Sequence, residues 1–277
     1  MDPDAFAALH PDEYVKAFCD AGARPDGRAI DAARPLVIER GTLPSLPSSA
    51  LARLGDTLVM CAVRPVLARP AAATPDAGIV DVSVQVSGTV DAALSPMQPG
   101  GGRYPPSALD WAESLSELFA KGALVDLKQL CVLPGKAAWC IRCELVVLLS
   151  DGCELDACVA AAAAALHGCP LVMPPALASA CAHEAGAAGP SAASSLSLKA
   201  LPVPVTTAVV FGKTLVDPSA VEAAQASGTA LHVVALKPGQ RAGDGAVLLL
   251  RADGPGADAA AADAALELRW GQMWGKA

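Results

Sequence analysis

Four cysteines in one stretch of the chain are of the residue type that binds zinc. Cys140 and Cys143 form a C-x-x-C pair, and Cys153 and Cys158 follow. Thiolates are common zinc ligands in such pairs. The run Trp139–Leu149 has the composition of a strand, however, and side chains three apart on a strand point to opposite faces. We therefore expect buried, reduced thiols here and no metal site.

Three acidic residues follow the same run and have the oxygen ligands that a divalent cation prefers. They are Asp151, Glu154 and Asp156. Their positions also suit another use, because Asp151 precedes Gly152 in a turn and the other two fall at the positive end of an Ala-rich helix. We favour the turn and helix-start interpretation.

Two further patterns have residues suited to nucleotide or hydrolytic chemistry but lack the context for it. Gly212-Lys213-Thr214 is similar to the end of a phosphate-binding loop, yet Thr207 stands where the first glycine belongs, and strand-like runs flank the segment. We expect a hairpin turn there. The four histidines, at positions 10, 167, 183 and 232, form no H-E-x-x-H, and no G-x-S-x-G elbow is present.

Three arginines are candidates for contact with RNA. Arg64, Arg69 and Arg103 follow strand-like runs, at the edges of loops from which a guanidinium can reach a backbone phosphate. The alternative is that they are solvated, since the chain as a whole is acidic.

The elements that must position these residues include strands, with a hydrophobic period of about two residues, and helices, with a period of about 3.6. Val80 to Val86 alternates apolar and polar residues, as a half-buried strand does. Gly55-Asp56 separates two strands as a tight hairpin. Further expected strands are Leu36–Arg40, Ala50–Leu54, Thr57–Val63, Val203–Val210, Thr214–Val216, Thr229–Leu236 and Val247–Arg251.

Four helices complete the prediction. They cover about residues 11–22, 107–122, 155–167 and 257–274. The second should bury a stripe formed by Leu109, Ala112, Leu115, Leu118 and Phe119. The Ala/Ser/Gly-rich segment 176–197 is expected to be a mobile surface loop. Strands mixed with helices throughout predict one α/β domain over residues 1–277, with mixed β-sheets packed against α-helices.

Composition limits the classes of function. The chain has 277 residues, 53% hydrophobic and 17% charged, which excludes a disordered protein. Its net charge of −8 argues against tight RNA binding by the chain alone. The start lacks the features of a signal peptide and no apolar run reaches bilayer length, so we expect a soluble intracellular protein. The odd count of nine cysteines then indicates reduced thiols.

Six motifs follow one another along the chain: R-P-D-G-R at 24–28, S-A-L-A-R-L-G-D-T at 49–57, L-P-G-K-A-A-W at 133–139, D-G-x-x-L-D-A-C at 151–158, P-V-P-V at 202–205 and L-V-D-P at 215–218. In this order they resemble the motifs of the RNase PH-domain subunits of the RNA exosome ring, in the branch that is similar to the archaeal non-catalytic ring subunit.

The resemblance also shows what this chain lacks. In active relatives a Gly-Thr-Arg motif at the start of the helix after the D-G turn holds phosphate, whereas here the place reads Glu154-Leu155-Asp156-Ala157. Segment 221–228 lacks the acids of active relatives, and loop 95–104 keeps only Arg103. Phosphorolysis needs a cation beside inorganic phosphate, so both halves of such a site look degraded.

The resemblance therefore implies a non-catalytic structural subunit that supports 3′-to-5′ RNA processing and degradation, including rRNA maturation and mRNA turnover. It implies no cofactor. The implied partners are other RNase PH-like ring subunits, RNA-binding cap proteins, an associated hydrolytic ribonuclease and single-stranded RNA in the channel. The implied location is nucleus, nucleolus and cytoplasm. The alternatives are an active phosphate-dependent 3′-to-5′ exoribonuclease and an RNA-binding module that acts alone.

Overall fold

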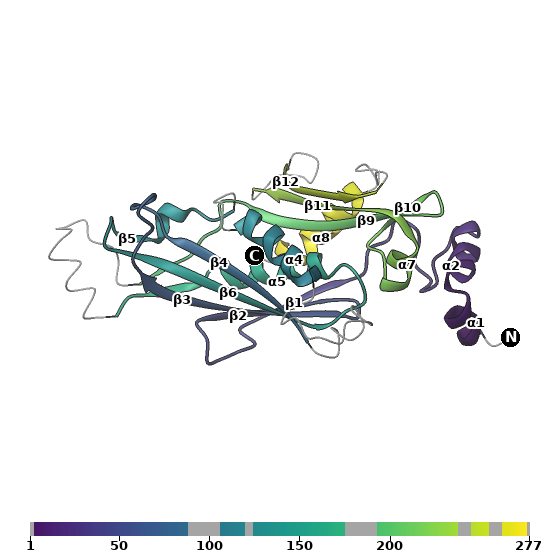
Figure 1. Cartoon of the computed structure of the whole chain (residues 1–277), viewed down its shortest axis with the longest axis horizontal. Helices are drawn as coiled ribbons and strands as arrows, with labels where there is room; N and C mark the ends of the chain where they lie inside the picture. The colour runs from purple at the N-terminus through teal and green to yellow at the C-terminus, as the bar shows by residue number, and fades with distance from the viewer. Residues whose placement is uncertain are drawn as a thin grey trace.

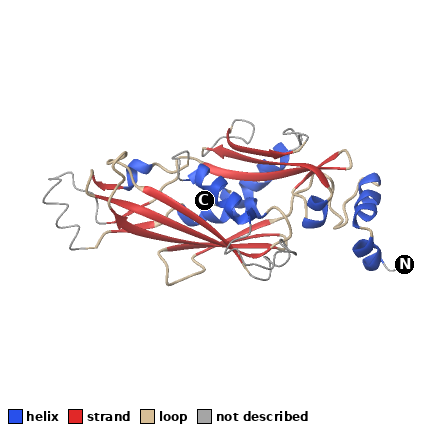
Figure 2. Ribbon diagram, viewed as in Figure 1, coloured by secondary structure: helices blue, strands red, loops and turns tan. Residues whose placement is uncertain are grey.

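Two β-sheets lie on either side of a central helix in the computed structural model of the chain (Figure 1). The structure describes residues 3–87, 106–119, 124–174, 193–237, 245–254 and 262–275. Figure 2 shows the two layers of strands with helices between them, and the N-terminal helices at one end.

The larger sheet has the strand order β1-β2-β3-β6-β4, and a short strand β5 also pairs with β6. All its pairs are antiparallel except β4 with β6. Its strands are β1 (Leu36–Arg40), β2 (Ser48–Leu54), β3 (Thr57–Ala68), β4 (Ile79–Val86), β5 (Cys131–Leu133) and β6 (Ala137–Leu149).

The smaller sheet is antiparallel, in the order β10-β9-β11-β12. Its strands are β9 (Leu201–Val210), β10 (Lys213–Val216), β11 (Ala226–Leu236) and β12 (Ala246–Asp253). A separate pair joins β7 (Pro170–Val172) to β8 (Ala193–Ser195).

The helices are α1 (Pro3–Leu9), α2 (Pro11–Asp20), α4 (Pro106–Phe119), α5 (Glu154–Leu166), α7 (Ala220–Ala224) and α8 (Asp263–Trp274), with a 3-10 turn η1 (Leu127–Leu130). Helix α5 contacts β2 and β3 on one side and β9 on the other. Every residue from Leu155 to Leu166 is buried. A helix that is apolar all round belongs in a core, and its alanines let both sheets approach closely.

Sequence periodicity predicted most of this architecture. The fold class, mixed sheets packed with helices, is confirmed, and the strands predicted at Leu36–Arg40, Thr57–Val63 and Val80–Val86 are present. The turn of Gly55-Asp56 joins β2 to β3, and Phe211-Gly212 joins β9 to β10 with positive φ at both residues. The phosphate-loop interpretation of Gly212 therefore gives way to a hairpin.

Two expectations were wrong in detail. Leu109 was placed in the buried stripe of α4 but is 60% exposed, whereas Ala108 is buried beside Leu115. The C-terminal boundary of the expected loop 176–197 was also wrong, because Ala193–Ser195 forms a strand that pairs with β7. Residues 175–192 lie outside the described ranges. Within the described ranges no helix combines the length and hydropathy needed to span a bilayer.

Candidate functional site

The family-like motifs, far apart in sequence, meet at the N-terminal end of α5. Thr57 donates its hydroxyl to the carbonyl of Gly152 at 2.8 Å and accepts the backbone N–H of Asp151 at 2.9 Å. A Cβ on Gly152 would lie 2.7 Å from the carbonyl oxygen of Pro218. The L-G-D-T, D-G and D-P motifs are thus in direct contact.

Asp217 lies at the centre of this junction and is fully buried. It accepts hydrogen bonds from the backbone N–H of Arg34 at 2.6 Å and from the Arg34 guanidinium at 2.8 Å and 3.1 Å. The Arg269 guanidinium, on α8, lies 3.3 Å away. Burial alone would raise the pKa of Asp217, but these cations hold it below its ordinary value.

The R-P-D-G-R motif is also structural. Arg24 is buried, pairs with Glu222 through two nitrogens, and donates to the carbonyls of Val216 at 2.7 Å and Asp217 at 2.9 Å. Arg28 donates to the Asp217 carbonyl at 3.2 Å. These arginines are therefore committed to the fold, where buried charges need partners.

The start of α5 already holds an anion that belongs to the chain. The Glu154 carboxylate accepts the backbone N–H of Gly152 at 3.1 Å and the hydroxyl of Ser150. Donors and dipole at a helix start attract anions. The Glu154 carboxylate therefore lies on the turn that precedes α5, beside the helix start at which the resemblance puts the phosphate-binding motif of active relatives.

Asp156, two residues further on, is completely buried. It accepts hydrogen bonds from the Thr206 backbone N–H at 3.0 Å and the Thr206 hydroxyl at 2.6 Å. Burial raises its pKa to about 6, although nearby Arg269 opposes this shift. Asp156 therefore ties α5 to β9.

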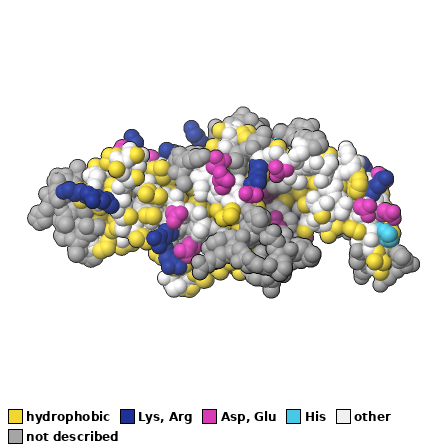
Figure 3. All heavy atoms as spheres, viewed as in Figure 1, with side chains coloured by type: hydrophobic (Ala, Val, Ile, Leu, Met, Phe, Trp, Pro, Cys, Tyr) yellow, Lys and Arg dark blue, Asp and Glu magenta, His cyan; other side chains and the backbone are white. Residues whose placement is uncertain are grey.

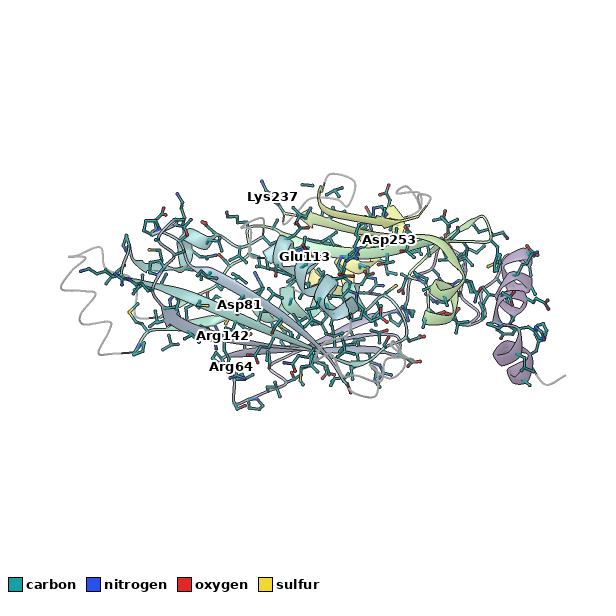
Figure 4. All side chains as sticks on the ribbon, viewed as in Figure 1. Arg64, Asp81, Glu113, Arg142, Lys237 and Asp253 are labelled. Atoms are coloured by element: carbon teal, nitrogen blue, oxygen red, sulfur yellow. The ribbon has the colours of Figure 1, made fainter. Side chains whose placement is uncertain are left out.

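A pocket of about 300 Å³ opens beside this helix start. Among the described residues, its lining includes the acids Asp110, Glu154 and Asp253 and one basic residue, Arg251. Arg251 lies 3.5 Å from Asp110 and 3.8 Å from Asp253, so its charge is already balanced. Figure 3 shows acidic side chains around a basic one over α4 and β12, and Figure 4 labels Asp253 there. The pocket is net acidic and unsuited to phosphate.

The predicted RNA-contact arginines are not brought together at this pocket. Arg64 was expected at the edge of a loop, and this was wrong, because it lies inside β3. Its side chain is exposed and lies 3.2 Å from Glu144. The strand continues past Pro65 because β2 pairs with β3 only as far as Val63, which leaves that edge free. Arg69 follows the end of β3 and is exposed. Arg103 lies outside the described residues.

Arg64 has charged neighbours across the larger sheet. Its register partner is Arg142 on β6, which in turn faces Asp81 on β4. Figure 4 shows the three side by side. This row mixes both signs of charge, so it is not a phosphate-binding patch on its own.

The cysteine pattern follows the strand geometry predicted for it. Cys143 is buried and its Sγ lies 3.4 Å from that of Cys61, whereas Cys140, on the other face of β6, is half-buried. Across the described residues, no three metal-ligating side chains are placed to hold an ion. His183 lies outside those residues, and His232 is buried with its Nε2 3.5 Å from the Thr207 hydroxyl.

The roles of Arg34, Glu222 and Arg269 were not predicted. Arg34 and Glu222 stand beside motifs that were recognised, so proximity to the R-P-D-G-R and L-V-D-P motifs could have indicated them. No recognised motif lies near Arg269 in the sequence, and it reaches Asp217 only through the packing of α8.

Comparison with known proteins identifies the class. Residues 32–169, about half of the chain, match the family model RNase_PH, described as the 3′ exoribonuclease family, domain 1. This chain therefore carries an RNase PH domain.

Within that class it is similar to exosome components. It is 28% identical to the exosome complex component rrp43 of Schizosaccharomyces pombe over 166 residues, which is 59% of each protein. The aligned part is thus less than two thirds of that relative. It is also 28% identical over 231 residues to the exosome complex component Rrp42 of Methanosarcina acetivorans, covering 83% of this chain and 80% of that one.

The solved structures agree with this similarity. A chain of the Archaeoglobus fulgidus exosome with RNA bound to the active site superimposes with a TM-score of 0.71 and 26% identity, covering 94% of both chains. The comparisons thus point to the Rrp42 and Rrp43 type, and the sequence motifs look most like the second, ribosomal RNA processing protein forty-three.

Proposed function

We propose that this chain is a non-catalytic structural subunit of the RNA exosome ring, which supports 3′-to-5′ RNA processing and degradation by forming part of the channel. Support comes from the RNase PH domain, from relatives named as exosome components, and from the likeness to an exosome chain over almost its full length.

The observation that carries the non-catalytic half of the proposal is the Glu154 carboxylate at the start of α5. Attack of phosphate on RNA brings two anions together, so it needs fixed cations at that place. Here a carboxylate lies on the turn before the helix, and Arg251, which is the one basic side chain among the described residues that line the adjoining pocket, is paired with acids. Inorganic phosphate would meet repulsion instead of a cation.

The proposed partners and cellular locations of the chain are inferred from its family. The partners are other RNase PH-like ring subunits, RNA-binding cap proteins, an associated hydrolytic ribonuclease and single-stranded RNA that passes through the channel. The places are the nucleus, the nucleolus and the cytoplasm, with rRNA maturation and mRNA turnover as the processes served. Arg64 and Arg69, both exposed, remain the described candidates for RNA contact.

A phosphorolysis assay tests the catalytic half. The purified chain is incubated with uniformly labelled single-stranded RNA with and without inorganic phosphate, and the labelled nucleoside diphosphates that are released are measured. We expect none above background. Phosphate-dependent release that is lost in Arg251→Ala, and kept in the matched surface variant Arg64→Ala, would establish the alternative of an active exoribonuclease.

Gentle purification of the tagged chain from its native cells tests the assembly half. Near-stoichiometric recovery of five other RNase PH-like chains, identified by mass spectrometry, is the expected result. Recovery of the chain alone, or as a homo-oligomer, would refute the ring role and leave the assay above as the test of what it does.

A further inference from the structure

Thr74 is an exposed hydroxyl residue in the loop 69–78, which joins β3 to β4. Pro75 follows it directly. The sequence has one other Ser or Thr that directly precedes a proline, Ser95, and this residue lies outside the described ranges. A hydroxyl residue followed by proline is the minimal sequence that proline-directed protein kinases accept. The motif indicates a class of modifying enzyme, and the conformation of the loop decides whether that enzyme can reach Thr74.

The loop presents Thr74 at its tip. Residues 71–76 are all exposed, and none of the described residues hydrogen-bonds to the Thr74 hydroxyl. The Thr74 N–H donates to the Ala71 carbonyl at 3.0 Å, and the Thr74 carbonyl accepts the Ala77 N–H at 3.3 Å, so two turns meet at this residue. Contact with the proline ring keeps the residue before a proline extended. An extended acceptor at an exposed loop tip is accessible to an enzyme that acts on polypeptides.

Two backbone hydrogen bonds hold the loop against the rest of the molecule. The Pro75 carbonyl accepts the Gly135 N–H at 2.8 Å, on the turn 134–136 between β5 and β6. The Gly78 N–H donates to the Leu127 carbonyl of η1 at 2.8 Å. Figure 1 shows this region around β5, at the end of the molecule opposite the N-terminal helices. A phosphate on Thr74 would therefore meet a defined set of neighbours.

The charged residues of the loop and of the two segments that hold it are mainly basic. Arg69 begins the loop, Lys128 lies in η1 and Lys136 lies on the β5–β6 turn. Asp76 is the acid of the loop, and its carboxylate lies 3.7 Å from the Lys128 Nζ. Both side chains of this pair are more than half exposed, so the pair contributes little and Lys128 can turn to a stronger anion. Phosphothreonine is such an anion, with about −1.5 to −2 charges at pH 7 and three acceptor oxygens.

We propose that Thr74 is a phosphorylation site for a proline-directed protein kinase, and that its phosphate pairs with Lys128. In the transfer, the Thr74 hydroxyl oxygen bonds to the γ-phosphorus of ATP and the bond from that phosphorus to the ADP oxygen breaks. The hydroxyl proton passes to the catalytic aspartate of the kinase. The added negative charge makes this end of the molecule less attractive to other polyanions. The inference rests neither on the ring role nor on the loss of phosphorolysis.

Labelling in a cell extract tests the site. The full chain is incubated with an extract of its native cells, phosphatase inhibitors and ATP that carries a radioactive γ-phosphate. Cleavage before aspartates then releases the peptide 56–75, in which Thr74 and the buried Thr57 are the only hydroxyl residues. Ser95 lies on a different peptide. We expect label on 56–75, at Thr74 when the peptide is fragmented in the mass spectrometer.

Three variants identify the acceptor and the class of kinase. Thr74→Val removes the hydroxyl at similar volume, and Pro75→Ala removes the proline while the carbonyl that Gly135 contacts stays. Both variants should lose the label on 56–75. Ser45→Ala is the matched control, because Ser45 is also exposed on a turn but has no proline after it, and it should keep the label. An unlabelled 56–75 peptide, or label that survives either of the first two substitutions, would overturn the proposal.

Titration of the phosphate tests its pairing with Lys128. A cation beside a phosphate lowers the second pKa of that phosphate. Phosphorus NMR of the phosphorylated full chain should therefore show a pKa that rises in Lys128→Gln. Lys199→Gln is the matched control, since Lys199 is exposed and pairs with Asp126 at 3.6 Å, and it should leave the pKa unchanged. The same pKa with and without Lys128 would overturn the pairing. None of these outcomes bears on the phosphorolysis assay or on the recovery of ring subunits.

Discussion

At the scale of single residues, the most informative group is the ion cluster around Asp217. The motifs that identify the family are held together by it, because Arg24, Arg28, Arg34 and Arg269 all place guanidinium groups on Asp217 or on its carbonyl. In this chain those arginines hold the polypeptide together and are not free for a substrate. The retention of the motifs therefore follows from folding and does not by itself indicate catalysis.

The first prediction concerns Asp217. Asp217→Asn keeps the shape of the side chain but removes the carboxylate that pairs with the buried Arg269, and it leaves Arg34 with Asp151 alone, at 3.1 Å. Removing one partner of a buried pair costs about 3–5 kcal/mol. We expect denaturant titration to show a loss of that size. The control Glu144→Gln removes the exposed pair with Arg64 and should cost less than about 1 kcal/mol. Equal losses would contradict a central role for Asp217.

The second prediction concerns the pH dependence that Asp156 confers. Its pKa is raised from 3.8 to about 6 in the folded chain, so the folded state binds the proton more tightly. The stability gained from protonation is complete below about pH 4 and is lost as pH rises to about 6. About two pKa units correspond to a loss on the order of 3 kcal/mol.

The variant Asp156→Asn isolates this contribution. The amide can still accept the Thr206 N–H and carries no charge at any pH. We expect the free energy of unfolding of the variant, relative to the natural chain, to increase between pH 4 and pH 6.5 by up to about 3 kcal/mol. Parallel stability curves for the two proteins would show that Asp156 does not titrate in this range.

At the scale of elements, the larger strands and helices follow from local pattern. The alternation in Val80–Val86 and the Gly55-Asp56 turn were sufficient to place β4 and the β2–β3 hairpin. The phase of α4 was read wrongly at Leu109, because that leucine lies one residue from the Ala108–Leu115 stripe that packs over β4. Short pieces such as α7 and β8 carry too few residues for any period to appear.

The candidate site was predictable only in part, because residues that contact each other there lie far apart in the sequence. The motifs around Asp151 and Asp217 were recognised, but the hydrogen bonds that join Arg34 to Asp217 span 183 positions. The anchoring of Glu154 on the Gly152 N–H depends on a backbone turn with positive φ at Gly152 and Cys153, which composition does not reveal. Burial of Asp156 required the placement of both sheets around α5.

The third prediction tests the contact between the D-G and D-P turns. Gly152 has φ +82° and its added Cβ would lie 2.7 Å from the Pro218 oxygen. Gly152→Ala therefore adds a steric clash to the cost of positive φ. Gly212→Ala is the matched control, because φ is +75° there and nothing lies within 4 Å. The control should lose about 1–2 kcal/mol for backbone strain alone, and Gly152→Ala clearly more. Equal losses would show that the two turns are not in close contact.

At the scale of the whole molecule, charge and shape favour a subunit of a larger assembly over a protein that binds RNA by itself. The chain carries a net charge of −8, and its exposed Arg64 shares a row with Asp81. The two sheets pack around α5, and the described residues that line the pocket at the helix start include three acids and one base. This balance is consistent with the proposed ring role, in which neighbouring subunits would supply the positive charge that RNA needs.

The last prediction follows from this charge balance. Because neutralised phosphates supply most of the affinity in nonspecific RNA binding, the isolated chain should bind a fluorescent 20-nucleotide oligouridylate with a Kd weaker than about 10⁻⁴ M at physiological salt. Fluorescence anisotropy at several salt concentrations measures this. Reversal of the exposed candidates, Arg64→Glu with Arg69→Glu, should then change little in the isolated chain. A micromolar Kd that rises steeply with salt concentration, together with a loss of binding in that double variant, would instead show that the chain binds RNA by itself through these arginines.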